Sequence, residues 1–287
     1  PTEEEISKMK GNQTLISALQ LRTRDRAYFK ALSDKKITAL ALEEVRDLLD
    51  QSALRIAMSE IAGQMAARVG ASLLSEGLNG LAKGKLMGGI PGVAPANVVV
   101  IGAGIAGVSA VHAARGMGAA VVLVDSAINR LREAQAKCDS SVITEVIQEI
   151  VLGKRLRAAD VVIGALGPVD GRTPLVVSEQ MVEQMPESSV IIDISIDSGG
   201  CFETSEATSH DIPTFRKYDV IHYCVPNMAS AVGHTASIAM SNIVGPMIQQ
   251  LANFGGVQES LHYDLNMRAG LYPVSYTHLR AHETSSY

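Results

Sequence analysis

Short apolar runs recur through the middle of the chain, and segments of helical pattern separate most of them. The runs are NVVVIGAG, AAVVLVD, ADVVIGAL, SVIIDIS and VIHYCV, and together they extend from Asn97 to Val225. Strands this apolar, alternating with helices, are typical of a parallel sheet that helices cover on both faces. The pattern therefore predicts an α/β fold built on a doubly wound parallel sheet.

The hydrophobic pattern is different on either side of these alternating strands and helices. Before it, MSEIAGQMAARVGASLL carries apolar side chains at helical spacing, and KGKLMGGIPGVAP predicts a loop. After it, TASIAMSNIVGPMIQQLANF predicts a helix that breaks near Gly245-Pro246. The remaining segments mix short helical and strand patterns. The pattern therefore divides the chain into residues 1–53, the alternating region with its preceding helix at 54–233, and a helical region at 234–273.

Three glycines follow the first apolar run in the spacing G-x-G-x-x-G, directly after a predicted strand and at the start of a predicted helix. Gly102 permits a tight turn, Gly104 allows a pyrophosphate to approach the backbone, and Gly107 allows the helix to pack closely on the strand. The next apolar run ends at Asp125, near the expected distance of roughly 20 residues. A carboxylate there binds ribose hydroxyls and repels a 2′-phosphate, which predicts NAD as the cofactor, although Arg130 nearby offers a partner for NADP.

The run SVIIDIS carries two acidic residues in or beside an otherwise apolar strand. Asp193 lies inside it, and we expect a buried carboxylate bonded to neighbouring backbone. Asp197 lies at or just past its carboxyl end, where ligands bind in open α/β sheets. Position alone leaves two equal interpretations of Asp197: a group facing the cofactor, or a loop-capping acid before Gly199-Gly200.

Composition narrows the classes of function. The chain has 287 residues, of which 47% are hydrophobic and 19% charged, with a formal net charge of −5. One large or two ordinary domains fit this length, and the absence of a basic run argues against a partner nucleic acid or anionic membrane. No apolar stretch reaches the roughly 18 residues of a membrane span. Three widely spaced cysteines, Cys138, Cys201 and Cys224, predict buried thiols in a cytoplasmic protein, without a disulfide frame or metal site.

The two ends of the chain have an unusual appearance. No Met precedes Pro1, and VSYTHLRAHET resembles the translation of a sequencing adapter. Within it, His278 and His282 with Glu283 imitate a zinc-binding helix, an interpretation we reject. We expect residues 274–287 to be an artefact and the chain to be a fragment.

Several motifs occur in the order found in one known family. They are MSEIAGQMAARVGASLL, GGIPGV, VVVIGAGIAG, IIDISIDSGGCFETSE and VIHYCVPNMASAVGHTAS. This order resembles that of the alanine dehydrogenases, which share a family with the α subunit of proton-pumping nicotinamide nucleotide transhydrogenase. The likeness extends over residues 1–273. It implies a Rossmann-type NAD-binding domain at 54–233, with residues 1–53 as the remnant of a truncated α/β substrate domain and 234–273 as a helical return to that domain. It implies a cytoplasmic homo-oligomer in which L-alanine, NAD and water give pyruvate, ammonium and NADH reversibly.

The resemblance also implies roles for single residues. Ser59 would contact the phosphate region of the cofactor, and Asn227 and Met228 would lie near the nicotinamide. Asp197 matches the catalytic carboxylate of the family, which handles protons as ammonia adds to the keto acid. The family often has a His in a Y-L-H-L-like stretch, where this chain has Gln20. A glutamine donates hydrogen bonds but transfers no proton, so Gln20 either holds the substrate oxygen or is an exposed polar residue.

The resemblance leaves part of the substrate site upstream of the chain. The Arg and Lys that bind the substrate carboxylate in the family would precede Pro1, so we expect the 287-residue chain to be nearly inactive. Two other functions stay open: a transhydrogenase α-type subunit that passes hydride to a partner's NADP, and a non-catalytic NAD sensor. A sensor would need Gly104 and Asp125 but not Asp197.

Overall fold

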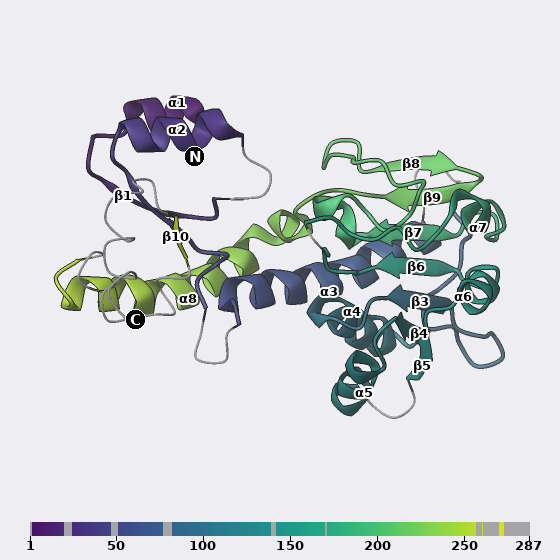
Figure 1. The fold of residues 1–287 in the computed structure, drawn as a ribbon. Coiled ribbons are helices and arrows are strands. Elements are labelled where there is room, and N and C mark those ends of the chain that lie inside the picture. The colour runs from purple at the N-terminus through teal and green to yellow at the C-terminus, as the bar shows by residue number, and fades with distance from the viewer. Residues whose placement is uncertain are drawn as a thin grey trace, which may run out of the picture. The chain divides into compact units, whose positions relative to one another are not determined.

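The computed structural model describes residues 2–19, 25–46, 51–76, 82–138, 142–169, 171–256, 260 and 270–272 (Figure 1). The chain divides into two compact units. The smaller unit combines Pro1–Ala57 with Ser237–Tyr287, and the larger unit is Met58–Ala236.

A three-stranded sheet forms the centre of the smaller unit. Its strand order is β1-β2-β10, with β1 and β2 parallel and β10 antiparallel to β2. The elements of this unit are α1 (Glu3–Lys8), β1 (Thr14–Ser17), α2 (Arg26–Asp34), β2 (Thr38–Ala41), most of α8 (Gly233–Asn253) and β10 (Leu271–Tyr272).

Alternation along β2 directs its side chains to two helical layers. Ala39 and Ala41 lie in one core cluster with α1 and α2, whereas Leu40 packs with Leu251 of α8. Because successive side chains of a strand point to opposite faces, this short strand is buried on both sides. The smaller unit is therefore itself a layered α/β structure.

The helix α8 corrects one prediction. It continues through Pro246 as one α-helix, whereas the sequence pattern predicted a break there. Proline removes one backbone hydrogen bond to the preceding turn, four residues earlier. Residues 242, 245 and 246 are all exposed, so the carbonyl that loses its partner lies on the solvent side of the helix, where the loss is tolerated.

Seven strands form the sheet of the larger unit, in the order β5-β4-β3-β6-β7-β9-β8. All neighbouring pairs are parallel except β8 and β9. The strands are β3 (Asn97–Ile101), β4 (Ala120–Asp125), β5 (Ile143–Val146), β6 (Val161–Gly164), β7 (Val190–Asp193), β8 (Thr214–Lys217) and β9 (Val220–Tyr223). This sheet confirms the predicted α/β fold.

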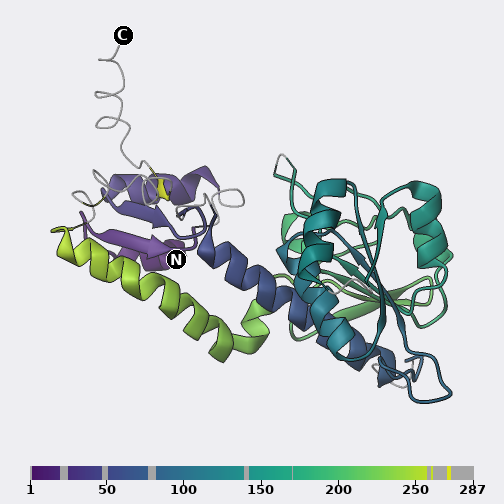
Figure 2. The same ribbon diagram turned by 90° about the horizontal axis from the view of Figure 1, so that it is seen from below.

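Helices cover both faces of that sheet (Figure 2). Val98 and Val100 of β3 pack in one core cluster with α3, α4 and α5, while Val99 and Ile101 pack in another with α6 and α7. The doubly wound arrangement follows from central strands that bury apolar side chains on both faces of the sheet. The helices are α3 (Ala53–Ser75), α4 (Ile105–Gly116), α5 (Ile128–Lys137), α6 (Glu149–Leu156) and α7 (Glu179–Glu183), with the 3-10 helices η1 (Ile194–Ser198) and η2 (Met228–Val232).

The structure describes the three cysteines and allows a search for metal-binding groups and for membrane-spanning helices. Cys138, Cys201 and Cys224 are free and buried. Within the described ranges, no group of three or more His, Cys, Asp or Glu side chains could hold a metal ion. No helix among those same ranges is both long and apolar enough to cross a membrane. The histidines of the C-terminal tail lie outside the described residues.

A buried histidine connects β9 with its edge strand. His222 is fully buried; its Nδ1 lies 3.1 Å from the Val220 carbonyl oxygen and its Nε2 lies 2.9 Å from Thr204 Oγ1. Its ring stacks on Phe215 with centroids 4.8 Å apart. A neutral imidazole satisfies both contacts, with Nδ1–H donating and Nε2 accepting. Burial lowers the pKa of His222 to about 4.

We predict an acid-sensitive contribution to stability from His222. Below pH 6.5 the unfolded chain binds a proton at this residue, whereas the folded protein resists protonation until about pH 4. The free energy of unfolding should therefore fall by about 3 kcal/mol between pH 7 and pH 4 through this group. Urea unfolding of the parent and His222→Gln at both pH values measures the difference. Equal losses of stability in the two proteins would contradict this assignment.

Candidate cofactor and catalytic site

The glycine-rich loop begins where β3 ends. Gly102 has φ +108°, a backbone conformation that favours glycine, and its N–H donates to the Val124 carbonyl oxygen at 2.7 Å. A Cβ at Gly102 would lie 2.5 Å from the Ala165 carbonyl oxygen. A side chain therefore does not fit at this position.

The third glycine of the motif serves packing. A Cβ on Gly107, in the first turn of α4, would lie 1.7 Å from the carbonyl oxygen of Gly102. Helix and loop are thus in contact at this point. A glycine on α3 acts similarly, because a Cβ on Gly63 would lie 2.1 Å from the Ala106 carbonyl oxygen.

The middle glycine of the motif differs from Gly102 and Gly107. Gly104 is the N-cap of α4 with φ −78°, a value that any residue adopts, and nothing lies within 4 Å of a Cβ built on it. Neither backbone conformation nor packing within the described residues requires glycine here. The open space lies at the N-terminus of a twelve-residue helix, where unpaired N–H groups and the helix dipole favour an anion. The residues present fit a phosphate group that approaches the backbone.

Asp125 holds the glycine loop from the neighbouring strand. Its Oδ2 accepts a hydrogen bond from Ala103 N and its Oδ1 accepts one from Ala127 N, both at 2.8 Å. The residue is almost fully buried. Asp125 therefore joins the glycine loop to the start of α5. Each carboxylate oxygen retains a further lone pair, and the binding of a ribose hydroxyl by this residue stays a prediction.

Ser59 lies on α3 one helical turn before Gly63. Residues four positions apart share a helix face, so Ser59 belongs to the face that packs on the first turns of α4. Its side chain is half-buried. Its contact with the phosphate region stays a prediction.

Asp197 and Asn227 meet at the carboxyl edge of the sheet. Asp197 lies in η1, directly after β7, and Asn227 precedes η2, after the adjacent strand β9. The N–H of Asn227 donates to Asp197 Oδ1 at 3.0 Å. Asn227 adopts the left-handed conformation, with φ 53° and ψ 53°, which directs its backbone toward η1. Two residues that are 30 positions apart in sequence are thus in contact at this edge.

The carboxylate of Asp197 is suited to proton transfer. Although Asp197 is exposed, partial desolvation raises its pKa above the ordinary aspartate value, while the hydrogen bond from Asn227 acts in the opposite direction. The residue keeps contact with solvent. A carboxyl group with a raised pKa and an open path for protons is a candidate general acid and base.

Met228 and Gln20 were also predicted to belong to the site. The Met228 side chain is buried in the core cluster that faces α3 and α4, which leaves its backbone as the part able to face a ligand. Gln20 lies outside the described residues, so its role stays a prediction.

Sequence reasoning missed one cation beside the Asp197 segment. Arg172, on the connection between β6 and α7, packs against Gly199 at the end of η1, and a Cβ there would lie 3.2 Å from its Nε. The residue is exposed. No spacing rule identifies it, because it lies 25 positions before Asp197 in sequence.

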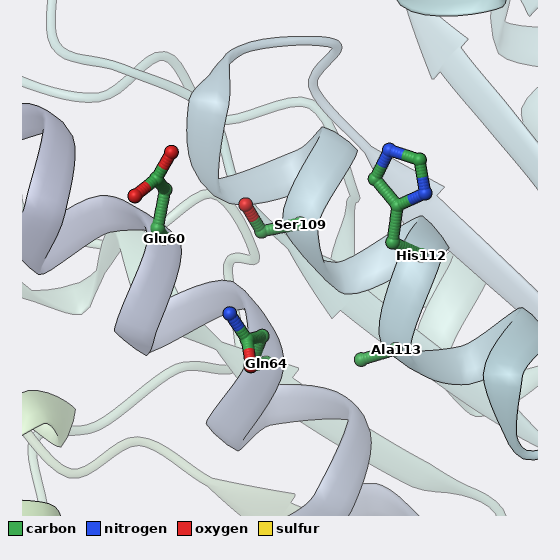
Figure 3. Close-up of a pocket in the computed structure, with 5 residues that line it drawn as sticks. All are labelled: Glu60, Gln64, Ser109, His112 and Ala113. Atoms are coloured by element: carbon green, nitrogen blue, oxygen red, sulfur yellow. The ribbon is translucent and has the colours of Figure 1, made fainter. Parts of the chain in front are cut away.

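A separate polar cavity lies between α3 and α4 (Figure 3). Its volume is about 460 Å³, and it is lined by Glu60, Gln64, Ser109, His112 and Ala113. None of the predicted cofactor or catalytic residues lines it. The open space at Gly104 and the Asp197–Asn227 pair, at the carboxyl edge of the sheet, agree better with where such sheets bind ligands.

Comparison with known proteins identifies the family. The family model described as "Alanine dehydrogenase/PNT, C-terminal domain" matches residues 66–275. The chain belongs to this family. It is 41% identical to alanine dehydrogenase of Mycolicibacterium smegmatis over 255 residues, which is 89% of this chain and 68% of that protein. It is 40% identical to alanine dehydrogenase of Methanococcus maripaludis over 257 residues, with the same shares. The resemblance predicted from the motifs is confirmed.

Two solved structures share this fold. An L-alanine dehydrogenase superposes with a TM-score of 0.89 at 35% identity, covering 94% of this chain and 74% of that one. A transhydrogenase from Sinorhizobium meliloti superposes with a TM-score of 0.79 at 20% identity, covering 94% and 76%. The second likeness shows the shared fold alone.

Proposed function

We propose that this chain carries the cofactor-binding and catalytic parts of an NAD-dependent alanine dehydrogenase. The reaction would convert L-alanine, NAD and water reversibly into pyruvate, ammonium and NADH. Relatives named alanine dehydrogenase at about 40% identity support this substrate class. The exposed apolar side chains along α8, Ile238, Met240 and Ile248, support the homo-oligomer that the resemblance implies.

One observation carries the proposal: the open space at Gly104 and the Asp197 carboxylate lie at the same edge of one parallel sheet. Gly104 follows β3 and Asp197 follows β7, with β6 as the single strand between them. Two strand spacings correspond to roughly 10 Å. An extended dinucleotide with its pyrophosphate at Gly104 can reach the Asp197–Asn227 pair at that separation.

The residues of the chain would hold the cofactor in a defined way. The backbone at Gly104 and the first N–H groups of α4 would bind the pyrophosphate, and Asp125 would bind the adenosine ribose. Asn227 would lie beside the nicotinamide. NAD, when bound, supplies the acceptor for the hydride that leaves the α-carbon of alanine.

Asp197 would manage the protons of the reaction. In the deaminating direction a water molecule adds to the oxidised substrate and ammonia leaves, so one proton is removed from the water and one is delivered to the departing nitrogen. A carboxylate with a raised pKa performs both transfers in turn. The Asn227 N–H fixes one carboxylate oxygen and leaves the other for the substrate.

The experiment is an assay of NADH oxidation by the full-length gene product with pyruvate, with and without ammonium. Oxidation that requires both compounds supports the proposal. Tight NADH binding without dependence on either compound would contradict it and favour a transhydrogenase-type subunit or an NAD sensor.

A further inference from the structure

Asp193 is a buried carboxylate that accepts hydrogen bonds from three directions. It ends β7 and is 1% exposed. Oδ1 accepts from Ser195 N at 3.0 Å, and Oδ2 accepts from Cys201 N at 3.0 Å and Ser205 Oγ at 2.7 Å. Burial raises its pKa, while the bonds from Ser205, Cys201 and Ser195 act in the opposite direction. The expectation of a buried, backbone-bonded Asp193 is confirmed.

Two glycines make room for this carboxylate. Gly200 has φ +78°, and a Cβ on it would lie 2.7 Å from Asp193 Oδ2. A Cβ on Gly164 of β6 would lie 2.5 Å from Cys201 Sγ and 3.1 Å from Asp193 Oδ1. The absence of both side chains therefore allows the loop after η1 to fold back onto Asp193. This accounts for Gly200, the second of the two glycines that follow the acidic strand.

The contacts of Asp193 extend to both halves of the candidate site. Its bond from Ser195 N caps η1, the short helix that carries Asp197. Its bond from Ser205 continues to Cys224, whose Sγ lies 3.6 Å from Ser205 Oγ. Cys224 precedes Asn227 by three residues, on the segment that leads from β9 to η2. One buried carboxylate is thus connected to the segments that present both members of the Asp197–Asn227 pair.

We propose that Asp193 is a positioning residue, which holds Asp197 in register with Asn227 for proton transfer. This inference rests on the proposed function of Asp197. Asp193 itself is shielded from solvent, so it acts through the segments it binds and not on the substrate. A displacement of about 1 Å at a catalytic group can reduce a rate by roughly 100-fold, which sets the scale of the expected effect.

The variant Asp193→Asn removes the network with little change of size. An amide has one oxygen and one NH₂ group, so at least one of the two N–H donors, from Ser195 or Cys201, would face another donor. Ser205→Ala is a milder variant that keeps the carboxylate and removes only the Ser205 hydroxyl, with its bond to Asp193 and its contact with Cys224. If Asp193→Asn does not fold, the same measurements are made on Ser205→Ala in its place.

Asp160 offers a matched control in the same unit. It is also a buried aspartate, and it binds Lys83 Nζ at 2.7 Å, Lys85 Nζ at 2.6 Å and Asn97 N at 2.8 Å. It directly precedes β6, at the amino edge of the sheet, opposite the candidate site. Asp160→Asn should lower stability without moving Asp197.

Two readouts separate positioning from a general loss of stability. The first is the titration of the Asp197 carboxyl carbon by ¹³C NMR in the 287-residue chain, assigned by comparison with Asp197→Asn. The second is kcat of the full-length gene product for pyruvate, ammonium and NADH, with thermal unfolding measured alongside. The NMR arm remains informative even if the full-length product has no such activity, so failure of this inference and failure of the proposed function are distinguishable.

In Asp193→Asn we expect the Asp197 pKa to shift away from its parental value, because Asp197 loses its register with the Asn227 N–H that bonds to it. We also expect kcat to fall by about 10- to 100-fold with NADH affinity unchanged. Ser205→Ala should show the same changes to a smaller degree, and Asp160→Asn neither change. A folded Asp193→Asn with the parental Asp197 titration would overturn the inference. So would an Asp160→Asn variant that lowers kcat as much as Asp193→Asn does.

Discussion

Replacing Asp197 by asparagine should lower kcat of the full-length gene product by about 10²- to 10⁴-fold, the range that general acid–base groups contribute. Asparagine has nearly the same size, and its carbonyl oxygen still accepts the Asn227 N–H at the position of Oδ1. It cannot take up or deliver the proton. NADH affinity should be unchanged, because the role proposed for Asp197 concerns the substrate and not the cofactor. Steady-state kinetics and NADH fluorescence titration measure the two quantities.

The pH dependence of the rate of alanine oxidation tests the same role of Asp197 independently. Partial desolvation raises the pKa of Asp197, so the carboxylate form is lost as pH falls through a value above that of an ordinary aspartate. The rate of alanine oxidation should fall over this interval in the parent, and that limb should be absent from the residual activity of Asp197→Asn. Asp211→Asn is the control, since Asp211 is an exposed aspartate of the same unit. Undiminished kcat in Asp197→Asn would refute the catalytic role.

Replacing Gly104 by valine should weaken NADH binding by at least about 100-fold, which corresponds to about 2.7 kcal/mol. A side chain at this position would occupy the space that the proposed pyrophosphate needs, next to the N-terminus of α4. The fold should be retained, because φ is −78° and nothing lies within 4 Å of the added Cβ. Fluorescence titration with NADH and a thermal melt of the same sample measure both effects.

Two other glycines provide the comparison. Gly153 of α6 also has open space around a built Cβ but is remote from the candidate site in sequence, so Gly153→Val should bind NADH normally. Gly107→Ala should lose stability instead, since its Cβ would lie 1.7 Å from a backbone oxygen. Normal NADH affinity in Gly104→Val would show that this space is not a cofactor site.

The sequence predicted those strands in which most consecutive residues are buried. Strands β3, β4, β6, β7 and β9 are buried at most positions and therefore appear as unbroken apolar runs. The edge strands β5, with sequence ITEV, and β8, with sequence TFRK, have no fully buried position. Edge strands are solvated on one side and lose the apolar signal, so these two were not predicted.

The features of the candidate site also fall into two groups, those that the sequence indicated and those that only the structure shows. The glycine spacing and the ends of the strands are local features, and they indicated Gly104 and Asp125 directly; they left two interpretations of Asp197, between which the family resemblance decided. The contact from Asn227 to Asp197 joins residues 30 positions apart. The bond from Ser205 to Asp193 depends on how a loop folds back over two glycines. Such contacts depend on tertiary packing, which single-sequence periodicity does not encode.

The most direct test of the central claim is to follow the transferred hydride. The full-length gene product is incubated with pyruvate, ammonium and NADH deuterated at the reactive position of the nicotinamide, and the alanine formed is examined by mass spectrometry. We predict L-alanine carrying one deuterium at its α-carbon, formed by the parent and by Asp211→Asn at similar rates and by Asp197→Asn about 10²- to 10⁴-fold more slowly. NADH binding without any labelled alanine from the parent would contradict this prediction.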